Sequence, residues 1–174
     1  MTFKKTLSLI LVLYLLSIAS IVFSQNDSNK RTFGLSATLQ GIQYGMNLPI
    51  WLGERATLGP SFQLIYAEEF GTDIGLGLVS KIYIKHEKIS PYAGFKIGFI
   101  SNMPNKTIYN QQKTITDLYG GIAVGGEYFF DRQFSINVEF QGNVTKSNAD
   151  SYRFGNPGGV IINTATMVAA NIYF

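Results

Sequence analysis

Apolar and polar side chains alternate with a period of two through most of this sequence, and this pattern constrains the fold more than any other feature. It is clearest in residues 134–145, FSINVEFQGNVT. Successive side chains of a strand point to opposite faces, whereas a helix brings together residues three and four apart. No helical period occurs after Gln25. The sequence therefore predicts an all-β fold built from amphipathic strands.

The alternating segments divide into eight predicted strands. The connections at residues 40–41 and 131–133 are short enough for hairpins, and they keep the flanking apolar residues on one face. Consecutive hairpins form an antiparallel up-and-down meander, and an even number of strands lets it close into a barrel without free edges. The predicted strands are Thr32–Gln40, Ile42–Leu52, Thr57–Tyr66, Ile74–Ile84, Tyr92–Ile100, Asp117–Phe130, Phe134–Thr145 and Gly159–Phe174. Pro49 and Pro60 lie within two of them and suggest bulges near the turn at residues 53–56.

The composition of the two faces indicates which one points outward. The polar face is rich in glycine and other small residues, which suit the narrow interior of an eight-stranded barrel. The apolar face carries no charge, and a charge facing lipid at mid-depth costs roughly 2–4 kcal/mol. It also carries two aromatic bands, as membrane interfaces favour. These bands are Phe33, Phe130, Phe134 and Phe174 at one end, and Tyr44, Tyr66 and Phe99 toward the other. We therefore predict a closed eight-stranded transmembrane barrel with a polar lumen; the alternative is a soluble barrel with the faces reversed.

The first 24 residues have the pattern of a secretory signal. A short basic segment ending at Lys5 precedes 17 uncharged residues, 7–23, and a small residue stands at Ser24. This order of regions is typical of a cleaved signal peptide, and a transmembrane anchor is the alternative. We predict a signal peptide over residues 1–24, a short linker over 25–31 and the barrel domain over 32–174.

Composition excludes several kinds of site. The chain has no cysteine, which excludes disulfides and thiolate metal sites. Cleavage of the signal would leave 12 basic and 11 acidic residues, so a nucleic-acid partner is not expected. His86 is the sole histidine, too little for a usual metal site. We expect no catalytic residue, no cofactor and no metal.

At this point the sequence resembles the small eight-stranded outer-membrane barrels of the OmpA/OmpX type. The signal segment, the eight strands and the C-terminal Asn171-Ile172-Tyr173-Phe174 carry the likeness. The resemblance implies a bacterial outer-membrane location, outer-membrane lipid as a partner and periplasmic termini. It also implies that Tyr173 and Phe174 belong to a C-terminal signal read by the outer-membrane assembly machinery. Residues 53–56, 85–91 and 131–133 would then be periplasmic turns, and residues 40–41, 67–73, 101–116 and 146–158 external loops.

Two groups of residues are candidates for function. Lys81, Lys96, Glu127 and Glu139 fall on the lumen face, where opposite charges should pair because lone buried charges are costly. They form either a plug of ion pairs and hydrogen bonds, which we favour, or the lining of an ion-selective pore. In the long external loops, Tyr109, Tyr152 and Arg153 are candidates for contact with an unidentified surface partner.

The function predicted from the sequence is non-enzymatic. We expect a filled-lumen barrel that acts in envelope structure or in surface interaction through its external loops. The alternatives are a minor pore or transport-associated barrel and, less favoured, a lipid-modifying enzyme, which would need a Ser–His–acid set built on His86.

Overall fold

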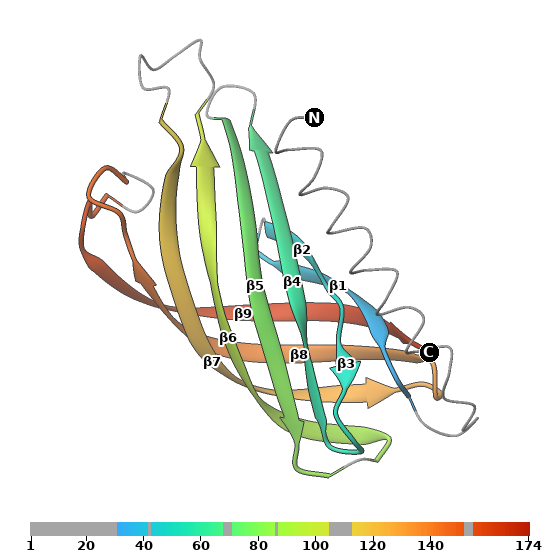
Figure 1. Cartoon of the computed structure of the whole chain (residues 1–174). Helices are drawn as coiled ribbons and strands as arrows, with labels where there is room; N and C mark the ends of the chain where they lie inside the picture. Colours follow the sequence, from blue (N-terminus) through green and yellow to red (C-terminus); the bar gives the residue numbers. More distant parts are fainter. Residues whose placement is uncertain (1–30, 42, 68–70, 86, 105–112, 152–154) are drawn as a thin grey trace, which may run out of the picture.

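The chain folds into a closed antiparallel β-barrel in a computed structural model (Figure 1). The structure describes residues 31–41, 43–67, 71–85, 87–104, 113–151 and 155–174. The predicted signal segment therefore lies outside the described residues. No helix in the described part of the chain is long and apolar enough to cross a membrane. The strands are β1 (Gly34–Gln40), β2 (Gln43–Asn47), β3 (Ile50–Trp51), β4 (Ala56–Ala67), β5 (Gly71–Tyr83), β6 (Ile89–Met103), β7 (Ile115–Phe129), β8 (Phe134–Lys146) and β9 (Val160–Tyr173).

The nine labelled segments make eight barrel strands, because β2 and β3 are two pieces of one strand. Both pair with β4, and the sheet runs β2-β1-β9-β8-β7-β6-β5-β4-β3. The pairing of β2 with both β1 and β4 closes the sheet on itself. The predicted closed eight-stranded antiparallel barrel is thus confirmed. We call the end where β1 begins and β9 ends the termini end, and the opposite end the loop end.

The break between β2 and β3 lies at Leu48 and Pro49, and it does not shift the register. The pairings with β4 keep the same offset on both sides of the break. The Pro49 carbonyl accepts a hydrogen bond from Gly34 N (2.8 Å), and the Pro60 carbonyl accepts one from Leu48 N (3.0 Å). Each proline removes one donor from the ladder but keeps its carbonyl in use. The bulges suggested by the sequence are therefore absent from this part of the described barrel.

Side chains alternate between the lumen and the outer surface along every long strand. In β8, Glu139 is 4% exposed, whereas the next residue, Phe140, is 63% exposed. The predicted facing is confirmed for the predicted strands, since every exposed large apolar residue within them was assigned to the outer face. Ile89 and Met103, which were placed in connections, are exposed as well. Phe33 and Phe174, predicted to share one aromatic band, stack with ring centroids 5.0 Å apart.

Some strand ends differ from those predicted. Strand β6 begins at Ile89 and ends at Met103, so it takes up residues assigned to the flanking connections. Ser90 and Pro91 were expected in a turn, and Ser101 and Asn102 in a loop. Ser90 and Asn102 occupy inward positions, where a polar lumen accepts them, so their polarity did not mark the end of the strand.

Candidate functional site: the barrel lumen

Glu127 is the centre of a hydrogen-bonded cluster in the lumen near the termini end. Its carboxylate is fully buried. Five side chains in the described part of the chain donate to it: Lys81 Nζ (3.3 Å), Tyr83 Oη (2.7 Å), Ser135 Oγ (2.5 Å), Tyr173 Oη (2.7 Å) and Asn171 Nδ2 (3.3 Å). A carboxylate offers about four acceptor sites. Its acceptor capacity is therefore filled, which makes a buried charge tolerable.

A second group of contacts links this cluster to Glu139. Asn137 Oδ1 accepts from Lys81 Nζ (3.3 Å), and Asn137 Nδ2 donates to Tyr92 Oη (2.9 Å). Tyr92 Oη in turn donates to Glu139 Oε2 (2.9 Å). The contacts run without interruption from Glu127 to Glu139, and we call them the lumen network. They tie strands β5, β6, β7 and β8 together across the interior.

The four charges predicted to share the lumen do so, but they do not form two ion pairs. Lys81 and Glu127 pair at 3.3 Å. Lys96 Nζ instead donates to Gln141 Oε1, while Gln141 Nε2 donates to Glu139 Oε1 (2.6 Å). Within the described ranges no carboxylate lies within 4.0 Å of the Lys96 ammonium. An amide therefore stands between this lysine and the nearest acidic side chain of the network.

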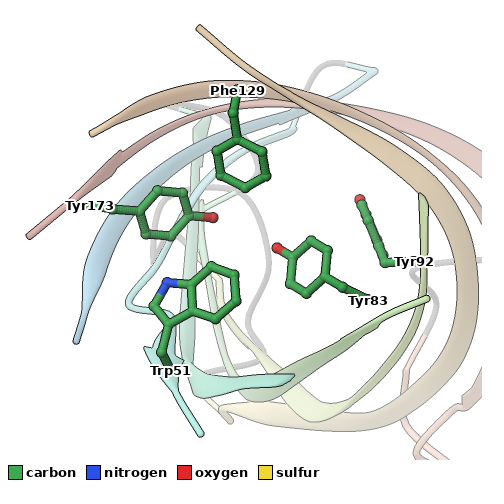
Figure 2. Packing of buried hydrophobic residues seen from close by; sticks show 5 residues of the cluster. All are labelled: Trp51, Tyr83, Tyr92, Phe129 and Tyr173. Atoms are coloured by element: carbon green, nitrogen blue, oxygen red, sulfur yellow. The ribbon is translucent and has the colours of Figure 1, made fainter. Parts of the chain in front are cut away.

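An aromatic layer closes the lumen toward the termini end (Figure 2). Neighbouring rings have centroids 5.2–6.0 Å apart. The guanidinium of Arg31 lies over the Phe129 ring at 4.0 Å, so a cation covers the layer on its outer side. The layer consists of Trp51, Tyr83, Tyr92, Phe129 and Tyr173. Five bulky rings of the described chain therefore occupy the lumen between the lumen network and this end of the barrel.

Glycines at the paired positions of the neighbouring strands make room for these rings. A Cβ at Gly34 would lie 2.6 Å from the ring of Tyr173, and a Cβ at Gly125 would lie 2.8 Å from the ring of Tyr92. Both distances are shorter than van der Waals contact. The glycines on the lumen face, which the sequence assigned to a narrow interior, thus serve a specific packing role.

A cavity of about 70 Å³ lies on the loop-end side of the lumen network. The charged side chains on its wall are Lys81, Lys96 and Glu139, and the other lining side chains include several amides and hydroxyls. Because one water needs roughly 10–15 Å³ of such volume, this space holds several waters or a small polar group. The lumen is therefore closed at one end and hollow toward the other.

At the loop end, Asp117 anchors the connection between β8 and β9. Its carboxylate is buried and accepts hydrogen bonds from Asn148 N (2.8 Å) and Ser151 Oγ (2.8 Å). Lys113, which leads into β7, pairs with Asp150 of the same connection at 2.8 Å. The described part of this loop-end connection is therefore held to the barrel rim.

The remaining site predictions fall partly outside the described residues. Tyr109, Tyr152, Arg153 and His86 all lie there. Of the predicted C-terminal assembly signal, Tyr173 points into the lumen and Phe174 faces outward. Among the described residues no three His, Asp or Glu side chains come together in a metal-binding arrangement.

Sequence reasoning missed the neutral partners that complete the lumen network and the aromatic layer. Asn137, Asn171 and Gln141 occupy inward positions, but they were treated as ordinary lumen polarity. The rings of the aromatic layer also fall on the inward face of the predicted strands. Five bulky aromatics on a face otherwise rich in glycine were a signal that could have located this layer.

Comparison with protein families gives one match over most of the chain. Residues 14–159 match the family described as outer membrane protein beta-barrel domain. No curated protein matches the sequence.

Two solved structures share the fold. One is the N-terminal β-barrel domain of Pseudomonas aeruginosa OprF, with a TM-score of 0.60 and 12% identity over 83% of this chain and 100% of that one. The other is Neisserial surface protein A, with a TM-score of 0.55 and 8% identity over 82% of this chain and 93% of that one. At such low identity these likenesses bear on the fold alone.

Proposed function

The chain belongs to the outer membrane protein β-barrel family, and from this premise we propose that it is a non-enzymatic barrel with a closed lumen, acting in envelope structure or surface interaction through its external loops. Membership in the family implies the bacterial outer membrane as its location. The apolar outer surface suits that environment, with the one charge on the outward face of β8, Lys146, at its loop end. A closed barrel also satisfies its backbone polar groups without water.

The observation that carries the proposal is the closure of the lumen. The lumen network joins four strands across the interior, and the aromatic layer covers it at the termini end. Eight strands leave little space beyond side chains. An ion would have to break the Lys81–Glu127 pair and displace stacked rings to pass, so we propose that the barrel does not conduct.

We also propose that residues 1–24 are a cleaved signal peptide and that the termini end faces the periplasm. The two longest connections, between β6 and β7 and between β8 and β9, both lie at the loop end, whereas all connections at the termini end are short, which is usual for the external and periplasmic sides of this class. Outer-membrane lipid and the assembly machinery are the proposed partners, the latter through Tyr173 and Phe174. The unidentified surface partner would meet the loops that carry Tyr109, Tyr152 and Arg153.

Conductance in planar lipid bilayers tests the closed lumen. The purified wild-type protein should give no steady channels. The paired substitutions Trp51→Ala and Tyr83→Ala remove two rings of the aromatic layer, and they should produce measurable conductance if that layer is the barrier. Steady wild-type channels that change on Lys81→Met would overturn the proposal in favour of the minor pore.

Cysteine labelling in intact cells tests the orientation. The chain has no native cysteine, so each introduced thiol is the only one. Asn156→Cys at the loop end should react with a membrane-impermeant maleimide, whereas Arg55→Cys in the turn between β3 and β4 should react only after the cells are opened. The reverse pattern would refute the assigned orientation without bearing on the closed lumen.

A further inference from the structure

The barrel wall is lower at the β1–β2 hairpin than elsewhere. Pairing of β1 with β9 ends at Leu39 and Val168, whereas β9 remains paired with β8 as far as Val160. On the other side, β2–β4 pairing ends at Tyr44, but β4 continues beside β5 to Ala67. In Figure 1 the β4–β5 and β6–β7 strands accordingly extend beyond this hairpin. The wall therefore has a notch above the hairpin, between β9 and β4.

The lumen cavity lies directly beside this notch. Its lining includes Gln40 and Gln43 from the low hairpin, Met167 from β9 and Gln63 from β4. Lys96 reaches the cavity from the opposite wall. The cavity lining therefore includes the low hairpin and both strands that flank the notch, which is where a route from the side would enter.

Two charges on the cavity wall, Lys96 and Glu139, have no ion pair within 4.0 Å among the described residues, and of these only Lys96 is a cation. Lys81 pairs with Glu127 at 3.3 Å, and both Glu139 oxygens accept hydrogen bonds, from Tyr92 and Gln141. Lys96 donates to the neutral Gln141 amide, and Glu139 attracts it only across that amide. An ammonium group carries three donors and is costly to shield from water without a counter-charge.

We infer that Lys96 marks a binding site for a small oxyanion, of the phosphate or carboxylate type, in the loop-end half of the lumen. The ammonium supplies the charge, and the side-chain amides of Gln43 and Gln63 on the facing wall supply neutral donors. The volume of about 70 Å³ admits such a group without movement of the lumen network.

The height of the notch allows the oxyanion to come from a lipid as well as from solution. The seven residues of β1, at ~3.3 Å each and a tilt of roughly 40°, rise about 18 Å. The outward apolar band of such barrels is about 25 Å tall. With β1 starting at the lower edge of this band, the hairpin tip lies roughly 7 Å short of the outer interface, so a lipid head group would reach the cavity through the notch.

Two titrations distinguish these sources. In the first, inorganic phosphate is added to the folded full-length protein in neutral detergent, and binding is measured by calorimetry. In the second, the protein is placed in nanodiscs of phosphatidylcholine with increasing phosphatidic acid, and retained lipid is counted by native mass spectrometry. Saturable binding in either titration supports the site and identifies whether the oxyanion comes from solution or from a lipid.

Matched variants decide whether Lys96 is responsible. Lys96→Gln should weaken binding at least tenfold, Lys96→Arg should retain it, and Lys146→Gln, which removes an exposed loop-end charge, should leave it unchanged. If Lys96→Gln does not fold, as judged by loss of its heat-dependent gel shift, Gln43→Glu at the cavity rim should abolish binding by repulsion. The absence of saturable binding in both titrations, or equal binding by wild type and the charge-altered Lys96 or Gln43 variants, overturns the inference.

Discussion

Two Lys–Glu pairs in this barrel differ in burial, and their comparison predicts that the longer pair is the stronger. Lys81 and Glu127 lie 3.3 Å apart with side chains 9% and 0% exposed. Lys85 and Glu87 lie 2.8 Å apart in a turn, with side chains 53% and 64% exposed. Distance alone would favour the exposed pair. Because solvent screens the exposed charges, we expect the buried pair to show the larger coupling energy.

The magnitudes follow from the surroundings of each pair. At an effective dielectric constant of ~20, charges 3.3 Å apart attract by about 5 kcal/mol before desolvation, whereas in water charges 2.8 Å apart attract by about 1.5 kcal/mol. Removing one partner of a buried pair typically costs about 3–5 kcal/mol, because the other charge is left buried. Exposed pairs contribute roughly 0–1 kcal/mol. We therefore expect Glu127→Gln to cost about 3 kcal/mol, and Glu87→Gln to cost less than about 1 kcal/mol.

A double-mutant cycle for each pair measures the coupling directly. The variants are Lys81→Met, Glu127→Gln and their combination, with Lys85→Met and Glu87→Gln as the matched exposed set. Unfolding by urea in phospholipid vesicles gives the free energies. Trp51, the single tryptophan, lies in the aromatic layer beside the buried pair and reports its unfolding by fluorescence.

The outcome that refutes the reasoning is specific. The buried cycle should give a coupling energy of about 1–3 kcal/mol. If its effects add within about 0.5 kcal/mol, the two side chains do not act as a pair. If the exposed pair couples as strongly, distance outweighs burial and the electrostatic account of the lumen network is wrong.

Three further predictions concern the outer face, the packing and a turn. Val138→Lys, on the outer face, should destabilise the inserted barrel by about 2–4 kcal/mol, as measured by urea unfolding in vesicles. Thr145→Lys, on the lumen face, should cost much less. Equal costs would contradict the assignment of these two residues to opposite faces. Gly125→Ala should cost about 1–3 kcal/mol in the same assay, since its Cβ would lie 2.8 Å from the ring of Tyr92. A Cβ at Gly126 would meet nothing within 4 Å, so Gly126→Ala should be neutral or slightly stabilising. Two backbone N–H groups of its own turn hold the pKa of Asp131 below its usual range, so its stabilising effect is present at neutral pH and disappears as the pH falls through that lowered pKa. The wild type should therefore lose more stability on acidification than Asp131→Asn does, and equal losses would show that this carboxylate makes no contribution.

The fold could be predicted from the sequence because lipid and lumen impose opposite demands on alternate residues. Along β8 every outward position from Phe134 to Val144 is apolar or glycine, so the facing of the whole strand follows from its period. Strand ends were harder to predict. Ser90 and Asn102 carry the polarity of loop residues, yet each is compatible with a strand whose inner face is polar.

The pairing inside the lumen could be predicted only in outline. Charge balance indicated that the four lumen charges should neutralise one another, and Lys81 and Glu127 do so. Whether Lys96 meets Glu139 or an amide depends on the register between β6, β7 and β8, which places Gln141 between them. Similarly, Asn137 could have been exchangeable lumen polarity, but its amide contacts both Lys81 and Tyr92. Such partnerships depend on cross-strand geometry that alternation alone does not specify.

The seam between β1 and β9 has a consequence for biogenesis. Leu35 of β1 pairs with Ile172 of β9, so the first strand of the barrel cannot complete its hydrogen bonds until the last strand has formed. Contacts this distant along a polypeptide form slowly, because the intervening segment must be ordered first. An incompletely folded chain therefore has two unpaired strand edges and an exposed apolar face, and it is prone to aggregate in water until β1 pairs with β9.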